Sequence, residues 1–350
     1  MLEARTLTDG GQAAEDVGAR LAAWLGQARR TLDLALYDVR LPGPIGDAVA
    51  GALRDAAARG VQVRIAFNAD GVRRGKPLPP PPRTEPSLLE ALGVPLRAIP
   101  GEPDLMHHKY AVRDGEAVWT GSSNWTLDSW TREENVLLTA ESAALAAAFE
   151  RNFAELWEGG VVDGSGAFDS APADVGGALV QPWFCPGRGE ELSHRIAARI
   201  AASRRRVRIA SPVLTAGPIL GTLGEVLGER RCDVRGVCDA TQVAQVFGQW
   251  RANPASRWKA PLLARILSGF EWSGKHSTPF APDAVHDYMH AKVTVCDDVV
   301  FAGSFNLSRS GELNAENVLE IADPALADRM AAFVDALVAR YPAVAVPEEF

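Results

Sequence analysis

The chain lacks any long hydrophobic run, and no apolar stretch approaches the roughly 20 residues that a membrane-spanning helix needs. Its N-terminus, Met1–Gly10, has neither the basic start nor the apolar core of a secretory signal. We therefore expect a cytoplasmic protein with no transmembrane segment. Cysteine is scarce, and the spacing of the four cysteines fits no zinc pattern. We expect reduced, structural thiols at Cys185, Cys232, Cys238 and Cys296.

Basic residues are outnumbered, with 36 Lys and Arg against 44 Asp and Glu, and the formal net charge of −8 argues against general nucleic-acid binding. The basic residues are nevertheless concentrated in two places. Segment 73–83 has four basic residues and no acidic one, and segment 247–280 has five basic residues and one acidic one. The first contains the stiff loop Pro77–Pro82, which we expect beside a cleft. Both segments could contact an anionic substrate.

The two halves of the chain resemble one another, and a length of 350 residues predicts about two domains. Apolar periodicity predicts strands near 32–36 and 61–67 in the first half and near 207–209 and 234–237 in the second, separated by amphipathic helices. Gly-Pro-Ile opens a helix at Gly43 and again at Gly217, and similar helices, 143–157 and 325–341, close the halves.

This pattern predicts an α/β fold made of two duplicated α/β sandwich halves. We place the first half at residues 1–160, a Gly-rich linker at 161–177 and the second half at 178–350.

One motif occurs once in each half: His-x-Lys-x(4)-Asp. It is followed by Gly-Ser-x-Asn and then by Glu-Asn-Val, with twelve residues from Ser to Glu in both copies. The first copy consists of His107, Lys109, Asp114, Ser122, Asn124 and Glu134. The second consists of His290, Lys292, Asp297, Ser304, Asn306 and Glu316.

Paired sets of this composition suit an anionic phosphorus centre. Residues i and i+2 on a strand point to one face, so each His projects with its Lys and each Ser with its Asn. The lysines, together with Ser122, Asn124, Ser304 and Asn306, could bind the non-bridging oxygens of a phosphodiester and stabilise its transition state. We therefore expect those hydroxyls and amides to bind substrate.

The two histidines can supply the reacting groups. A neutral His can attack phosphorus and form a phosphohistidine, while a protonated His on the other side protonates the leaving oxygen. We expect Glu134 and Glu316 to orient these rings, because a carboxylate on one imidazole nitrogen selects the tautomer at the other. Asp114 and Asp297, at strand ends, are expected to be structural supports.

These motifs resemble those of the phospholipase D superfamily, and the resemblance covers nearly the whole chain. It implies two similar halves related by a pseudo-two-fold axis with one active site between them, and chemistry that needs neither a metal nor another cofactor. It also implies that His107 is the nucleophile and His290 the acid and base. His108 adjoins His107, but its spacing to Lys109 favours His107 as the active residue.

Several alternatives stay open at this point. The histidines could bind a metal or be structural, and a duplicated module could bind anions without turnover. A phospholipid whose headgroup is hydrolysed or transferred is the favoured substrate, acted on by a monomer with peripheral membrane contact. The alternative is a metal-independent nuclease acting on DNA or RNA. Segment 260–270 could be a core helix or a lipid contact, and exposed tryptophans could stack bases or enter a headgroup layer; the candidates are Trp125, Trp130, Trp250, Trp258 and Trp272.

Overall fold

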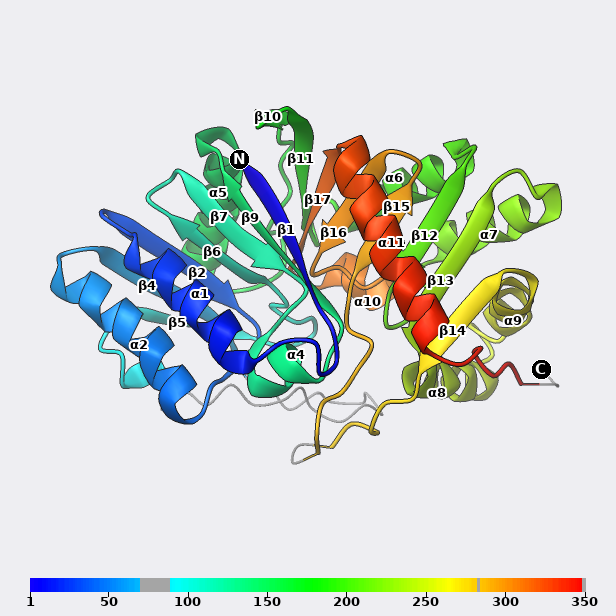
Figure 1. Cartoon of the computed structure of the whole chain (residues 1–350), viewed down its shortest axis with the longest axis horizontal. Helices are drawn as coiled ribbons and strands as arrows, with labels where there is room; N and C mark the ends of the chain where they lie inside the picture. The colour runs from blue at the N-terminus through cyan, green and yellow to red at the C-terminus, as the bar shows by residue number, and fades with distance from the viewer. Residues whose placement is uncertain (70–88, 282–283, 348–350) are drawn as a thin grey trace.

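The computed structural model describes residues 1–69, 89–281 and 284–347. The basic segment 73–83 and the loop Pro77–Pro82 lie outside the described residues. In the described part, each half of the chain is built around one large mixed sheet, and the two sheets stand side by side across the long axis of the molecule (Figure 1).

The two sheets share one strand order. In spatial order the first contains β1 (Leu2–Leu7), β9 (Asn135–Glu141), β7 (Ala117–Gly121), β6 (Lys109–Arg113), β2 (Thr31–Leu36), β4 (Gln62–Ala69) and β5 (Leu96–Pro100). The second contains β10 (Ala173–Val175), β11 (Ala178–Cys185), β17 (Glu316–Ala322), β16 (Val299–Gly303), β15 (Val293–Cys296), β12 (Arg206–Ala210), β13 (Asp233–Asp239) and β14 (Glu271–Lys275). From β1 and from β11 onward the parallel and antiparallel pairings also match, which confirms the predicted duplication of two α/β halves.

The helices repeat in the same way. The first half has α1 (Ala14–Gly26), α2 (Gly43–Ala58), α4 (Leu127–Thr131) and α5 (Ala143–Gly159), and a small sheet of β3 (Val39–Arg40) with β8 (Trp125–Thr126). The second has α6 (Gly189–Ala202), α7 (Gly217–Glu229), α10 (Arg309–Leu313) and α11 (Pro324–Arg340), and adds α8 (Ala240–Ala252) and α9 (Lys259–Gly269). Proline in the first turn of α2 and α7 suits a helix start, because its missing N–H has no intrahelical acceptor there.

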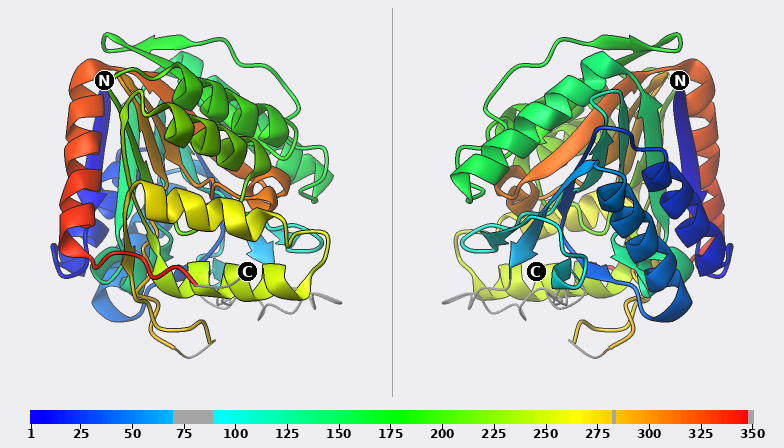
Figure 2. Two further views of the ribbon diagram at one scale, coloured as in Figure 1. Left: turned by 90° about the vertical axis from the view of Figure 1, so that its right-hand side faces the viewer. Right: turned by 90° about the vertical axis from the view of Figure 1, so that its left-hand side faces the viewer.

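Helices cover the outer face of each sheet. Figure 2 shows α1 and α2 on the outer side of the first half, and α6, α7 and α9 on that of the second. α9 buries Leu263, Ile266 and Leu267 and packs against α7, so segment 260–270 is a core helix. Within the expected linker 161–177, β10 forms a short edge strand on β11 of the second half.

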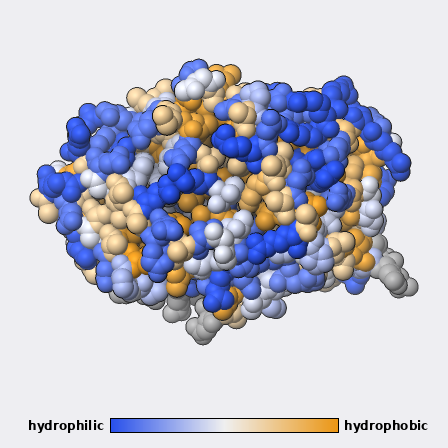
Figure 3. Space-filling model, in the orientation of Figure 1, coloured by the Kyte–Doolittle hydropathy of each residue, from blue (hydrophilic) through white to orange (hydrophobic). Residues whose placement is uncertain are grey.

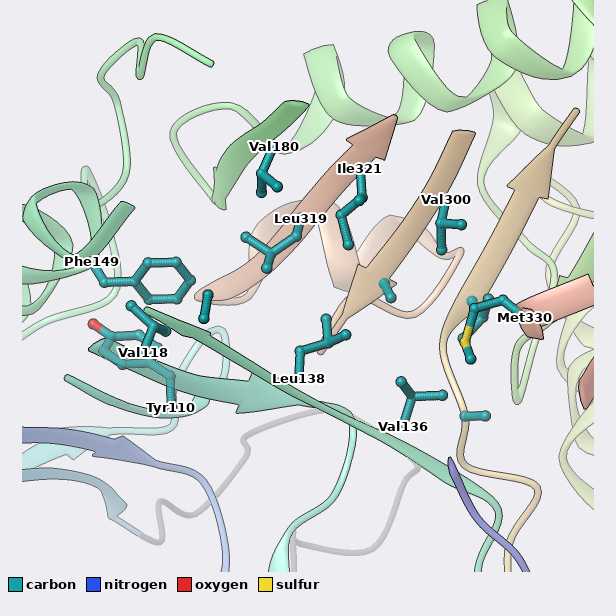
Figure 4. Packing of buried hydrophobic residues seen from close by; sticks show 14 of the residues in the cluster. Tyr110, Val118, Val136, Leu138, Phe149, Val180, Val300, Leu319, Ile321 and Met330 are labelled. Carbon is teal, nitrogen blue, oxygen red and sulfur yellow. The ribbon is translucent and has the colours of Figure 1, made fainter. Parts of the chain in front are cut away.

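A central core joins the halves. It is formed by the inner faces of both sheets together with α5 and α11, and its side chains meet in Figure 4, where Leu138 of β9 lies near Leu319 of β17. Because each side chain is fully or almost fully buried, the two halves hide apolar surface that either would expose alone. The junction is therefore part of the fold, and the site that lies on it is held by a packed core.

Asp114 and Asp297 occupy matched turns. Their backbones are left-handed, with φ of 60° and 52°. The Asp114 carboxylate accepts hydrogen bonds from the backbone N–H groups of Arg29, Arg30 and Thr31 at 2.6–3.1 Å. Asp297 accepts the three equivalent bonds, from residues 204–206, at 2.9–3.0 Å. Burial opposes ionisation, but these N–H groups keep the pKa of both carboxyls below the ordinary value. These are the contacts of a structural support.

Replacing Asp114 by Ala should lower the free energy of unfolding by about 1–3 kcal/mol, because charge-assisted bonds to three backbone N–H groups are lost and a side chain with a methyl group must keep a positive φ. Urea unfolding monitored by circular dichroism measures the change. Asp298→Ala, which removes a surface ion pair with Arg205, is the matched control and should cost about 1 kcal/mol or less. Equal effects of the two substitutions would contradict the supporting role.

Candidate active site

The two motif histidines are held from the opposite half of the chain. A parallel bridge between Met106 and Ala315, and a 2.9 Å bond from the His107 N–H to the Ala315 carbonyl, tie the first motif to the second half. There His107 Nδ1 lies 2.8 Å and 2.9 Å from the two carboxylate oxygens of Glu316. Glu316 is fully buried. This places Glu316 in the orienting position that we expected for it.

The second histidine is held differently. His290 Nδ1 lies 3.1 Å from Asn135 Oδ1 and 3.3 Å from Glu133 Oε2. Glu134, expected here from its twelve-residue spacing, instead pairs with Lys275 at 3.0 Å and also contacts the Tyr341 hydroxyl. Alternation along the chain explains the difference, because neighbouring residues in an extended segment point to opposite sides. Glu133 and Asn135, the two neighbours of Glu134, therefore face His290 in its place.

The two motif lysines make equivalent hydrogen bonds in the two halves. Lys109 Nζ donates to the His107 carbonyl at 2.6 Å, and Lys292 Nζ donates to the His290 carbonyl at 2.5 Å. Both side chains are almost fully buried. Lys109 also lies over the Tyr37 ring, 4.8 Å from its centroid. The bend of each lysine back to its own histidine keeps ammonium and imidazole together.

Burial disfavours the charged forms of the basic groups in this site and so lowers their pKa values. It lowers the pKa of Lys109 to about 7, and it lowers the pKa of Lys292 well below the ordinary value, with Lys109 as the next cause. It also lowers the pKa of His290, which Lys292, Lys109 and His107 depress further. Each motif histidine contacts the other half of the chain, so both motifs lie at one junction, where their basic groups lower one another's pKa. An anion bound between them would offset the repulsion, as a phosphate does.

The serines of the Gly-Ser-x-Asn motifs lie behind the histidines. Ser122 is fully buried, and its hydroxyl donates to Asn135 Oδ1 at 2.7 Å and accepts from the Val136 N–H. Ser304 is fully buried as well and accepts from the Asn317 N–H at 3.0 Å; burial raises the pKa of Glu316 to about 7, and a hydrogen bond with Ser304 opposes that rise. Because these hydroxyls support the residues that hold the histidines, their place is structural and differs from the substrate contact expected from the sequence.

The asparagines fit the substrate-binding expectation better. The side-chain oxygens of Asn124 and Asn306 are buried and have no hydrogen-bond partner among the described residues. A buried amide without a partner is costly unless a ligand or water completes it. Because an amide oxygen only accepts, these two oxygens need a donor, such as a substrate hydroxyl or a water, whereas a phosphate oxygen could be bound only by the Nδ2 groups.

His108 points away from the site. It is fully buried, its Nδ1 lies 3.2 Å from Asn317 Oδ1, and its ring packs edge-on against Tyr110. Burial lowers its pKa to about 3. This is a neutral core histidine, as the strand alternation predicts.

Sequence reasoning missed a group that follows β2. The Tyr37 ring lies 4.5 Å from that of His107, and the buried Asp38 forms an ion pair with Arg40 at 2.9 Å. Arg40 Nη2 in turn donates to His286 Nδ1 at 3.1 Å, across the junction of the halves. The signal was present, because polar residues directly after a parallel strand lie at the edge where α/β proteins bind ligands.

The described residues include no group of three histidine, cysteine, aspartate or glutamate side chains placed to hold a metal ion. Within the same ranges no helix is long and apolar enough to cross a membrane.

Comparisons with known proteins agree with this geometry. A family model described as cardiolipin synthase, PLD-like domain, matches the chain twice, at residues 21–157 and 196–338. Mitochondrial cardiolipin hydrolase of Xenopus laevis is 32% identical over 141 residues, which are 40% of this chain and 60% of the relative. The human protein of that name is 32% identical over 145 residues, or 41% and 52%. The chain thus spans little more than half the length of these curated relatives.

Solved structures share the whole fold. The phosphatidylserine synthase of Haemophilus influenzae aligns with a TM-score of 0.65 at 12% identity, over 96% of this chain and 86% of that one. A polyphosphate kinase of Porphyromonas gingivalis aligns with a TM-score of 0.62 at 14% identity, over 97% of this chain and 47% of that one. At these identities the likeness concerns the fold alone.

Anion binding should take up protons above pH 7. Lys109 has a pKa of about 7 in the unoccupied site, and a bound anion raises that pKa, so a lysine that is neutral at pH 8 becomes charged on binding. Affinity should therefore fall as pH rises above 7. Calorimetry with tungstate at pH 8, in two buffers of different ionisation enthalpy, measures the uptake, which Lys109→Gln should reduce. Proton release on binding would contradict this account.

Proposed function

Since the chain belongs to the family described as cardiolipin synthase, PLD-like domain, we propose that it is a phospholipase D-like phosphodiesterase that cleaves a P–O bond of a phospholipid and releases or transfers the headgroup. The observation that carries the proposal is that each motif histidine is held across the junction by the other half, His107 by Glu316 and His290 by Asn135 and Glu133. Because one chain supplies both halves of the site, the proposal requires only a monomer, which we place in the cytoplasm at a membrane surface.

In the first step, Nε2 of a neutral His107 attacks phosphorus and the P–O bond to the leaving alcohol breaks. Glu316 faces the opposite nitrogen, Nδ1, where it stabilises the positive charge that the ring acquires. His290 gives its proton to the leaving oxygen. Although burial lowers the pKa of His290 in the unoccupied site, a bound phosphodiester puts negative charge beside the ring and raises it.

In the second step, water or an alcohol loses its proton to His290 and attacks phosphorus, and the P–N bond to His107 breaks. The product is a phosphate monoester with water and a new diester with an alcohol. The ammonium groups of Lys109 and Lys292 donate to the non-bridging oxygens in both steps, and the Nδ2 groups of Asn124 and Asn306 are the amide donors available to them. Loss of one such donor typically slows turnover by about 10²–10³-fold.

A phospholipid substrate is supported by the names of the relatives and by one surface feature. Trp258, between α8 and α9, is 63% exposed, whereas the other four candidate tryptophans are buried. The ammonium of Lys259 lies 5.8 Å from its ring centroid, and Arg251 and Arg257 are exposed nearby. Residues 240–270 contain no acidic side chain. Tryptophan beside cations suits an anionic headgroup layer.

This tryptophan is connected to the site. α8 begins at its cap Asp239, whose carboxylate accepts the N–H of Met289, the neighbour of His290. Its 13 residues extend about 20 Å. Figure 1 places α8 and α4 along the lower side of the view, and on the face shown in Figure 3 hydrophilic residues surround smaller apolar areas.

The second candidate is a metal-independent nuclease. The observation that favours it is the same exposed Trp258 with its basic neighbours, because an aromatic ring beside cations also stacks bases and pairs with phosphates. The net charge of −8 weighs against it.

Wild-type protein should release headgroup from phosphatidylglycerol or cardiolipin vesicles in EDTA and leave labelled DNA and RNA intact.

His107→Ala and His290→Ala should reduce this activity to the assay background, because each removes a reacting group. With bis(p-nitrophenyl) phosphate, whose leaving group needs no proton, His290→Asn should trap a nitrophenyl phosphate adduct on His107, detectable by mass spectrometry, because the first step proceeds while the base of the second step is missing. Nucleic-acid cleavage without headgroup release would establish the nuclease instead, and an adduct on His290 in His107→Asn alone would reverse the order of the histidines.

Trp258→Ala should weaken binding to phosphatidylglycerol vesicles by about fivefold, which corresponds to ~1 kcal/mol of lost apolar burial. Co-sedimentation at moderate salt measures it, with phosphatidylcholine vesicles for comparison. Leu179→Ala is the matched control, because Leu179 is 53% exposed on β11 at the other end of the molecule. Unchanged vesicle binding together with weaker binding of single-stranded DNA would refute the membrane contact.

A further inference from the structure

The repeated Glu-Asn-Val triplets are not structural equivalents. In the antiparallel ladders Gly121 pairs with Leu137, whereas Gly303 pairs with Val318. Counting back two residues from Leu137 and Val318, Asn135 occupies the position of Glu316. The sequence match of Glu134 with Glu316 is therefore displaced by one residue.

Three further contacts agree with this register. The N–H of Ser122 donates to the Val136 carbonyl and that of Ser304 to the Asn317 carbonyl, both at 2.9 Å. β9 begins at Asn135 and β17 begins at Glu316. The parallel bridges that precede the two histidines involve Glu134 in one half and Ala315 in the other. The first half thus has one more residue between α4 and β9 than the second has between α10 and β17.

In this register a carboxylate and an amide have exchanged places. Asn314 and Glu316 of the second half correspond to Glu133 and Asn135 of the first. Each pair is internally bonded, since Asn314 Nδ2 donates to Glu316 Oε1 at 3.4 Å and Asn135 Nδ2 donates to Glu133 Oε2 at 3.2 Å. The same two chemical groups are kept near each histidine, but in opposite order.

Because of this exchange, the two histidine rings face different chemical groups. His107 faces both oxygens of the Glu316 carboxylate at 2.8 Å and 2.9 Å. His290 faces the neutral Asn135 oxygen first, at 3.1 Å, and Glu133 at 3.3 Å. The Glu133 oxygen that faces His290 also accepts from the Ser129 hydroxyl at 2.6 Å, so its negative charge is shared among several donors.

We propose that Glu133, acting with Asn135, is the positioning residue of the acid–base histidine His290. The exchange of carboxylate and amide suits His107 to nucleophilic attack and His290 to proton transfer. The inference rests on the proposed phosphodiesterase function. A ring that attacks phosphorus becomes cationic and stays so until the second step, which a directly facing carboxylate stabilises. A ring that first gives and then takes a proton must hold it less firmly, which a neutral amide with a shared carboxylate permits.

Charged groups surround both members of the pair. Those that act on the pKa of His290 or lie against its ring are Lys292, Lys109, His107, His286 and Glu133. Burial raises the pKa of Glu133 to about 7, Lys292 and Lys275 oppose that rise, and Lys109 and Arg40 also interact with its charge. Replacing only the Glu133 charge therefore leaves the lysines to depress the pKa of His290.

Glu133→Gln keeps the shape of the side chain and tests the role through the leaving group. Cleavage of phosphatidylglycerol, whose alkoxide needs a proton, should slow by about 10- to 100-fold in kcat with little change in KM. The first-turnover burst of nitrophenolate from bis(p-nitrophenyl) phosphate should slow far less, because this group leaves unprotonated and the burst precedes the step in which His290 acts as base. Glu316→Gln should slow both substrates, because the nucleophile serves both.

Two further variants complete the test. Glu134→Gln, equally buried but paired with Lys275, should leave the ratio of the two substrate rates unchanged. The double variant Glu133→Asn with Asn135→Glu reproduces the order found at His107, and it should recover activity that Glu133→Asn alone loses. Equal loss on both substrates in Glu133→Gln, or a double variant no better than the single one, would overturn the proposal.

A measurement without turnover separates this inference from the proposed function. In protein labelled with nitrogen-15 at histidine, Glu133→Gln should lower the pKa of His290, because a negative charge that favours imidazolium is lost, and should leave His107 unchanged. If the wild type cleaves no phosphodiester but this pKa shift is present, the proposed function is refuted and the positioning role of Glu133 still stands. Absence of the shift would refute the positioning role whatever the activity.

Discussion

The burial of four basic side chains at the junction of two halves is the constraint on which this structure depends. Lys109 and Lys292 are 2% and 4% exposed, and the rings of His107 and His290 lie with them. Charged groups so far from water need compensation. Part of it comes from Glu133 and Glu316, whose own burial raises the pKa of each to about 7. The remainder is best supplied by an anion with several oxygens, and this connects the fold to phosphodiester chemistry.

The duplicated architecture creates that junction. Inner faces of the two sheets, with α5 and α11, form a common core, so the halves cannot separate without exposing it. The parallel bridges at Met106 and Met289 then bring each histidine to residues of the other half. A fixed, buried junction lets short contacts, such as His107 with Glu316, select one tautomer of a ring. Pseudo-symmetry supplies two similar sets of groups, and small departures from it allow them different tasks.

Much of the fold was predictable from the chain. Alternating apolar residues mark β2, β4, β12 and β13, because strands and helices have different side-chain periods. The basic segment 247–280 shows the limit. Lys275 is buried against Glu134, while Trp258 and its neighbours are exposed, although composition treats them alike. The position of Tyr37 and Arg40 after β2 was a sequence signal, but their partners, His107 and His286, could not be identified because they are remote in sequence.

The sequence by itself determined the duplication and the identity of the motif histidines and lysines, because their spacing follows from strand alternation. Only the tertiary structure decided which groups serve those histidines. Equal twelve-residue spacings suggested Glu134, but ladder hydrogen bonds, which no spacing reveals, set the register of β9 one residue differently from that of β17. Since a one-residue shift turns a side chain to the opposite face, Glu133 and Asn135 face His290 while Glu134 faces Lys275.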